Sequence, residues 1–237
     1  MRALLIATCA ACSATEPAGA RQEVAPRVIA SAHAAAPDAA LAVTADASPA
    51  HAGDFVDVAA VIPDAVIDLR YAGDRNLTGA PLYPRDARCL LRRSVATRLA
   101  RAADALRAAD RRLVLWDCYR PHAIQLALWK ALPDAAHVAR PQTDPDGTPR
   151  SGSDHSRGGA VDVSLADRAG AILPMPTDHD DATPASARAA ALHASADART
   201  LDDAMTGAGF HPLASEWWHF AAPDAGRYPL TDGWPAI

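Results

Sequence analysis

Two short segments of the sequence combine ionisable side chains with the neighbours that a catalytic site requires. In the first, His155 is followed, after a pair of glycines, by Asp162 in an alternating stretch. In the second, Glu216 and His219 flank two tryptophans in a chain whose aromatic content is only 5%. Two histidines and an aspartate can hold a catalytic zinc ion and leave its fourth position open. A glutamate that is not a ligand could then act as general base, so these residue types predict metal-dependent hydrolysis.

Each segment also has a purely structural interpretation. A buried carboxylate such as Asp162 needs a partner, and an arginine is a commoner partner than a metal ion. His219 could be a core histidine with Glu216 at the rim of the core. On a straight strand Glu216 and His219 would point to opposite faces. A shared site therefore requires the chain to bend or turn at Glu216 before the last strand begins.

Arg120 is a third candidate because it lies where a strand is expected to give way to a helix. It precedes Pro121, and proline disfavours helical geometry at the preceding residue while suiting the first turn of a helix itself. An arginine at such a junction can point into a cleft and stabilise the oxyanion of a tetrahedral intermediate. The alternative is a salt bridge from Arg120 to Asp117 or Asp162.

The elements expected to position these residues are helices interleaved with short strands. Apolar residues at three- and four-residue spacing predict helices over 94–109, with Ser94 as the cap, over 121–132, and over 185–207. Strands are expected within 55–71 and at 113–116, 160–165 and 210–220. Residues 133–152 are dense in Pro, Asp, Thr and Gly, which predicts a long loop at the border of a site. This mixture favours an α+β fold over a doubly wound sheet.

The composition changes along the chain and indicates one folded domain, at 54–237. Residues 1–14 have a positive start, a short apolar run and small residues, the pattern of a secretion signal. Residues 15–53 are rich in Ala, Pro, Ser and Asp, which predicts a flexible tether. Cys12 resembles a lipoprotein cleavage site, so a lipid anchor there is the one membrane attachment expected. The net charge of -5 gives no electrostatic footprint for nucleic acid.

Taken in order, the motifs match a known family. They are residues 71–79, 117–121, 153–162 and 216–219. Together they resemble the D-alanyl-D-alanine dipeptidases (VanX type) from about residue 55 to the last residue. The resemblance implies an α+β fold shared with zinc D,D-carboxypeptidases and the Hedgehog signalling domain. Such a fold is a single domain with a small, mainly antiparallel sheet and flanking helices.

The resemblance also implies a role for each motif residue. Its zinc ligands correspond to His155, Asp162 and His219, and its general base to Glu216. Arg120 takes the place of the residue that stabilises the transition state, and Ser153 that of a substrate contact. Zn²⁺ is therefore the expected cofactor, and a small D-dipeptide is the expected substrate.

Asp180 corresponds to the aspartate that holds the free amino group of the substrate in the family. The stretch around it departs from the family pattern, because Pro176 stands where glycine is expected and His179 where an aromatic residue is expected. Asp178 and Asp181 are close enough in sequence to compete for the same role. The amine-binding residue is therefore expected to be one of these three aspartates, with Asp180 preferred.

Cys89 and Cys118 lie in the domain and can pair in an oxidising compartment. The bond would close a loop worth about 3–4 kcal/mol in the chain-entropy picture. Two unpaired buried thiols are the alternative. Export to the periplasm or cell envelope favours the disulfide.

The expected activity is hydrolysis of D-Ala-D-Ala or a similar D-dipeptide in peptidoglycan turnover. One alternative is a zinc D,D-carboxypeptidase that trims peptidoglycan stem peptides. The other is a non-catalytic, Hedgehog-like binding module that keeps zinc without turnover. The presence of both Glu216 and Arg120 argues against the binding module.

Overall fold

The computed structural model of the protein describes residues 54–237. The signal segment predicted at 1–14, with Cys12, and the tether predicted at 15–53 lie outside the described residues. Within 54–237, no helix has the length and apolar character needed to cross a membrane.

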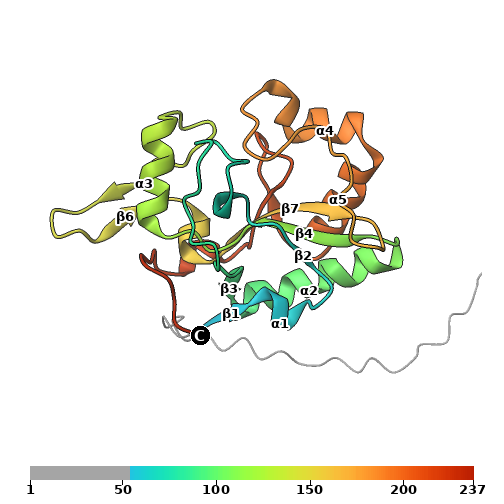
Figure 1. The fold of residues 1–237 in the computed structure, drawn as a ribbon, viewed down its shortest axis with the longest axis horizontal. Coiled ribbons are helices and arrows are strands. Elements are labelled where there is room, and N and C mark those ends of the chain that lie inside the picture. Colours follow the sequence, from blue (N-terminus) through green and yellow to red (C-terminus); the bar gives the residue numbers. More distant parts are fainter. Residues whose placement is uncertain (1–53) are drawn as a thin grey trace, which may run out of the picture. The chain divides into compact units, whose positions relative to one another are not determined.

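A five-stranded sheet lies at the centre of the domain (Figure 1). Its strands, in spatial order, are β2 (Val66–Ile67), β4 (Arg112–Asp117), β7 (Ala160–Ala166), β9 (His219–Ala221) and β8 (His211–Pro212). Only the β2–β4 pair is parallel, and the other pairs are antiparallel. The prediction of an α+β domain with a small, mainly antiparallel sheet is confirmed.

Two small two-stranded sheets accompany the central one. They are formed by β1 (Phe55–Asp57) with β3 (Leu90–Arg92), and by β5 (Gln142–Thr143) with β6 (Pro149–Ser151). The β5–β6 hairpin occupies part of 133–152, where only a loop was predicted. Its strands have polar, mostly exposed residues and no alternation, so the sequence carries little strand signal there.

Five α-helices and four 3-10 helices complete the described part of the chain. The α-helices are α1 (Val58–Val61), α2 (Arg93–Ala108), α3 (His122–Ala131), α4 (Arg188–Ala194) and α5 (Ala196–Gly207). The 3-10 helices are η2 (Arg70–Ala72), η3 (Asp154–Arg157), η4 (Pro184–Ser186) and η5 (Ala225–Arg227).

Three predicted helix boundaries need correction. Arg92 stands at the N-cap of α2, and Ser94 instead shares a hydrogen bond with the Tyr228 hydroxyl. Pro121 is the N-cap of α3, one position before the first turn. The single helical region expected over 185–207 is divided, because Ser195 leaves helical geometry and its side chain accepts from Ala198 N to cap α5.

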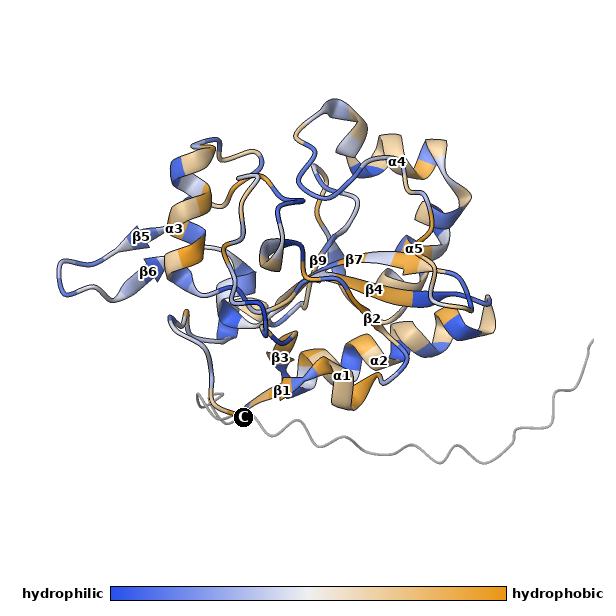
Figure 2. Cartoon of the chain, in the orientation of Figure 1, coloured by the Kyte–Doolittle hydropathy of each residue, from blue (hydrophilic) through white to orange (hydrophobic). Residues whose placement is uncertain are grey.

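The core lies between the sheet and the helices on its lower face in Figure 1. In α2 the buried positions Val95, Leu99 and Leu106 follow the helical period, and the helix packs against β4 and α5. Burying each such side chain contributes about 1.5–3 kcal/mol. Figure 2 shows the same division, with apolar residues gathered on β4 and α2 and polar residues on the β5–β6 hairpin. The hydrophobic sheet is therefore the scaffold that carries the polar site.

Candidate active site

Three side chains from η3, β7 and β9 converge at one end of the central sheet. The antiparallel register places Asp162 directly opposite His219, and His155 lies in the 3-10 turn just before β7. His219 Nδ1 is 3.0 Å from Asp162 Oδ1, and His155 Nε2 is 3.3 Å from the same oxygen. The two histidine nitrogens are 3.1 Å apart. The sheet register thus pairs two of the predicted ligands, and the 3-10 turn before β7 adds the third.

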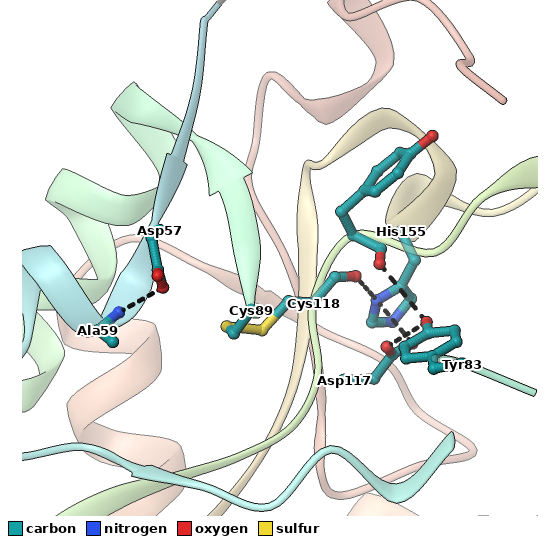
Figure 3. The surroundings of a disulfide bond; sticks show 8 residues. Asp57, Ala59, Tyr83, Cys89, Asp117, Cys118 and His155 are labelled. Carbon is teal, nitrogen blue, oxygen red and sulfur yellow. Dashed lines mark hydrogen bonds and ion pairs between the residues drawn. A yellow bond between two sulfur atoms is a disulfide. The ribbon is translucent and has the colours of Figure 1, made fainter. Parts of the chain in front are cut away.

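The orientation of His155 is fixed from behind its ring. Its Nδ1 donates to the carbonyl oxygen of Cys118 at 2.7 Å (Figure 3), and its Nε2 lies 3.3 Å from Asp162 Oδ1. The carboxylate of Asp117 lies 3.4 Å from the same Nδ1. Metal-binding histidines usually have such a carbonyl or carboxylate behind them.

Asp162 is a buried anion held among positively polarised groups. Burial raises its pKa, but His155 and the hydrogen bonds from three histidines outweigh burial and hold the pKa well below its ordinary value. Burial lowers the pKa of His155, and the charge of Asp162 reverses this and raises it. A buried carboxylate of this kind is stable only with a cationic partner.

The donor set fits a divalent metal ion. Histidine nitrogens and carboxylate oxygens lie about 2.0–2.2 Å from zinc, so neighbouring ligands of a tetrahedral site are about 3.3 Å apart. The three ligand atoms of His155, Asp162 and His219 are separated by 3.0, 3.1 and 3.3 Å. They can hold one ion and leave a fourth position for the adjoining pocket.

Glu216 lies in the turn between β8 and β9 and lines the same pocket as the three candidate ligands. The bend that a shared site requires is therefore present. Glu216 is also the only glutamate among residues 54–237. Burial raises the pKa of its carboxyl to about 7. A carboxyl group with this pKa can accept and return a proton near neutral pH.

Arg120 combines the two arrangements considered for it. Its guanidinium pairs with Asp117 Oδ2, at 2.7 Å from Nη2, and lies 3.6 Å from Asp162 Oδ2. A hydrogen bond to Gln125 and stacking over the Tyr71 ring complete its surroundings. The salt bridge holds the guanidinium rigidly at the wall of the pocket, beside the metal ligand.

Asp180 lines the same pocket from the loop before η4. The part of the pocket around Asp180 is called the amine end, and the part around the three candidate ligands is called the metal end. Its backbone has a positive φ of 59°, a strained conformation for a residue other than glycine. The carboxylate is held by Tyr71, whose hydroxyl donates to Oδ1 at 3.2 Å, and by the Leu77 amide, which donates to Oδ2 at 2.9 Å. The segment 71–79, the first of the family motifs, therefore positions this carboxylate.

The two competing aspartates lie in different surroundings. Asp178 pairs with Arg70 Nη1 at 3.0 Å and is absent from the pocket that Asp180 lines. Asp181 also lines that pocket, and one of its carboxylate oxygens accepts from the Thr183 amide. The pocket therefore excludes Asp178 and includes both Asp180 and Asp181, and the preference for Asp180 stays a prediction.

The pocket that joins the two ends has a volume of about 250 Å³. Its polar walls include Ser153, whose hydroxyl accepts from the amide of His155 and begins η3. Its apolar walls include Leu128, Leu132, Val138 and Leu213. A cavity that combines oriented charged groups with apolar walls suits a small polar molecule.

His179 is a buried residue of the site for which the sequence predicted no function. Its ring is buried among Tyr71, Trp116 and Trp218, with ring centroids 5.5–5.7 Å away. Nε2 lies 3.0 Å from Asp162 Oδ2. Burial lowers the pKa of His179, but Asp180 and Asp162 outweigh burial and raise it to about 9. The only signal in the sequence was an imidazole at a position where an aromatic residue was expected.

Cys89 and Cys118 form a disulfide, as predicted. The bond joins the residue before β3 to the residue after β4 (Figure 3). Because the Cys118 carbonyl accepts the hydrogen bond from His155, the disulfide lies directly behind a candidate metal ligand.

The loop that carries His155 into β7 is tightly enclosed. A Cβ atom at Gly158, where φ is 69°, would lie 2.4 Å from the Phe55 ring. A Cβ atom at Gly159 would lie 2.6 Å from the Cβ of Ala225. Further along the chain, the Thr231 amide donates to the Ser156 carbonyl at 2.9 Å. The first and last segments of the domain thus both pack against this loop.

Comparisons with known proteins agree with this geometry. Residues 51–235 match the family described as D-Ala-D-Ala dipeptidase. A protein of Escherichia coli (strain K12) called D-alanyl-D-alanine dipeptidase is 40% identical over 183 residues, covering 75% of this chain and 89% of that protein. A protein of the same name from Streptomyces coelicolor is 32% identical over 183 residues, covering 71% and 91%. One from Enterococcus faecalis is 31% identical over 179 residues, covering 69% and 88%.

The family match covers most of the chain and all the residues of the candidate site. Its members are metallopeptidases, in keeping with the cluster of His155, Asp162 and His219. The chain is therefore a peptidase and belongs to the D-Ala-D-Ala dipeptidase family.

Proposed function

We propose that the protein is a zinc-dependent dipeptidase that hydrolyses D-Ala-D-Ala or a similar D-dipeptide in peptidoglycan turnover. One observation carries the proposal: a single pocket of about 250 Å³ is lined both by a metal-type donor cluster and by the Asp180 carboxylate. The D configuration of the substrate is supported by the names of the relatives.

The residues of the pocket divide the work of peptide hydrolysis between them. His155, Asp162 and His219 would hold the zinc ion, which when bound would acidify a water molecule and polarise the scissile carbonyl. Glu216 would serve as the general base toward the attacking water and as the general acid toward the leaving amine. Its pKa of about 7 suits both transfers.

Arg120 supplies the fixed positive charge beside the reacting carbonyl. Its pairing with Asp117 and Gln125 holds the guanidinium in place before the substrate arrives. A charge that is already oriented stabilises the developing oxyanion without reorganisation during the reaction.

Asp180 selects for a short substrate because it binds the free ammonium group. With Tyr71 and the Leu77 amide fixing its two oxygens, the carboxylate marks one limit of the substrate in the pocket. A longer or N-blocked peptide would leave this partly buried anion without its ammonium partner. Ser153 lines the wall between the two ends and would contact the substrate backbone.

An exported location, in the periplasm or cell envelope, is part of the proposal. The Cys89–Cys118 disulfide supports it, since disulfides persist mainly in oxidising compartments. Attachment to the membrane, if present, would be through a lipid at Cys12. The location is tested by fractionating cells that express the full chain and by mass spectrometry of its mature N-terminus. Recovery of the unprocessed chain in the cytoplasm would contradict it.

The activity is tested with the purified full chain. Metal analysis should find one zinc per chain, and alanine release from D-Ala-D-Ala should stop with a chelator and return with added zinc. L-Ala-L-Ala and an acylated tripeptide ending in D-Ala-D-Ala serve as matched controls and should be poor substrates. Efficient cleavage of the acylated tripeptide would instead identify a D,D-carboxypeptidase. Bound zinc without turnover of any of these peptides would identify a binding module.

A further inference from the structure

His179 contacts two carboxylates that line the pocket, those of Asp162 and Asp180. Its Nε2 is 3.0 Å from Asp162 Oδ2, and its Nδ1 is 3.6 Å from Asp180 Oδ2. The side chain is wholly buried, so water does not replace either contact. Three aromatic rings surround the imidazole and leave it little freedom to turn.

His179 contacts Oδ2 of Asp162, the carboxylate oxygen that faces away from the other two candidate ligands. Oδ1 of Asp162 lies 3.0 Å from His219 and 3.3 Å from His155, while Oδ2 points to His179. The Arg120 guanidinium lies 3.6 Å from Oδ2, which is longer than a hydrogen bond. The imidazole N–H is thus the hydrogen-bond donor that fixes the rotation of this carboxylate.

We infer that His179 is a positioning residue that orients Asp162 for metal binding by donating from Nε2 to Oδ2. The inference deepens the proposed function and rests on it, since it concerns the affinity of the same site for its metal. Groups that hold a metal ligand from behind commonly change metal affinity by 10–100-fold when they are lost. A phenylalanine at this position could pack among the rings but could not donate.

The experiment separates the donor from the ring. His179→Phe keeps the ring and removes the donor, whereas His179→Gln removes the ring and keeps an amide donor near the position of Nε2. His179→Asn is the matched control, because its shorter amide places the donor near Nδ1, on the side of Asp180. Zn²⁺ affinity of the full chain is measured for each variant by competition with a chromophoric chelator.

Positioning through Nε2 predicts an order of affinities that packing does not. Zn²⁺ should bind about 10–100-fold more weakly to His179→Phe and His179→Asn than to the wild type, with His179→Gln within about fivefold of it. If His179→Phe does not fold, the Gln and Asn variants alone still test the order. A role in ring packing predicts the reverse, with the Phe variant nearest to the wild type.

The outcomes also separate this inference from the proposed function. Suppose that the wild type binds Zn²⁺. The role of His179 alone is then overturned if the Phe variant binds Zn²⁺ equally well, or if the Gln variant binds it as weakly as the Asn variant. A wild type that binds no Zn²⁺ overturns the zinc site itself, and the role of His179 with it.

Discussion

The two ends of the pocket are built in different ways. At the metal end, Asp162 and His219 are opposite one another in the β7–β9 ladder, so backbone hydrogen bonds set their distance. At the amine end, Asp180 lies in a loop and is held by side-chain and amide contacts from a segment more than 100 residues earlier. The Asp162 side chain is 3% exposed and that of Asp180 is 16% exposed. We therefore expect changes at the two ends to affect different measured quantities.

Glu216→Gln should give the largest effect and should separate the chemistry from the binding at both ends. Removing a positioned general base costs about 10²–10⁴-fold in rate. The kcat for D-Ala-D-Ala should fall by this factor, while zinc content and KM change little. Steady-state kinetics and metal analysis of the same preparation check the prediction. Unchanged kcat would remove Glu216 from the mechanism.

Loss of the disulfide tests whether the sheet alone holds the metal end. Cys89 and Cys118 are separated by 29 residues, so replacing both with alanine should lower the free energy of unfolding by about 3–4 kcal/mol. Zinc affinity of the folded molecules should stay within about threefold, because the β4–β7–β9 ladder remains. Urea denaturation and chelator competition measure the two quantities. A tenfold loss of zinc affinity would mean that the ladder is insufficient.

The pH dependence of the free energy of unfolding tests how far the Glu216 carboxyl is desolvated in the pocket. Its pKa rises from 4.5 to about 7 on folding, so between these values the folded state binds the extra proton. The free energy of unfolding of the metal-free protein should therefore decrease as pH rises from about 4.5 to 7, by roughly 3 kcal/mol from this group. Metal-free Glu216→Gln should lack this component. Parallel stability curves for the two proteins would contradict the burial of the carboxyl.

Asp180→Asn should produce the smallest of these effects and should act on substrate binding. A hydrogen bond to a charged group contributes about 1.5–3 kcal/mol, which predicts a rise in KM of about 10–100-fold. Zinc affinity should be unchanged. Asp178→Asn is the matched control, since Asp178 pairs with Arg70 outside the pocket. Equal rises in KM for the two variants would remove the amine-binding role from Asp180.

The same difference explains which parts of the site could be predicted from the sequence. An alternating strand shows that Asp162 shares a face with Ala160 and Ser164, and the need for a bend at Glu216 follows from the strand period. The contact between Tyr71 and Asp180 spans 109 residues and leaves no periodic trace. The role of His179 depends on such contacts too, so the sequence showed only an unusual residue there.

Local competition accounts for the errors in the elements. The alanine-rich stretch 185–207 has helical periodicity throughout, which hides the break at Ser195, where a side-chain cap starts a new helix. The β5–β6 hairpin has polar strands with no buried face, so hydrophobic pattern does not reveal it. In both cases hydrogen bonds, and not the spacing of apolar residues, decide where the helix or strand begins.

The crowding at Gly158 and Gly159 limits how the domain can be shortened or rearranged. Phe55 comes from the start of the described chain and Ala225 from near its end, and both close on the two glycines between His155 and β7. A truncation that removes Phe55 or Ala225 would loosen the loop that positions the imidazole of His155. A circular permutation with new termini beside either residue would do the same. The boundaries of a minimal active fragment are therefore set by catalysis as much as by folding.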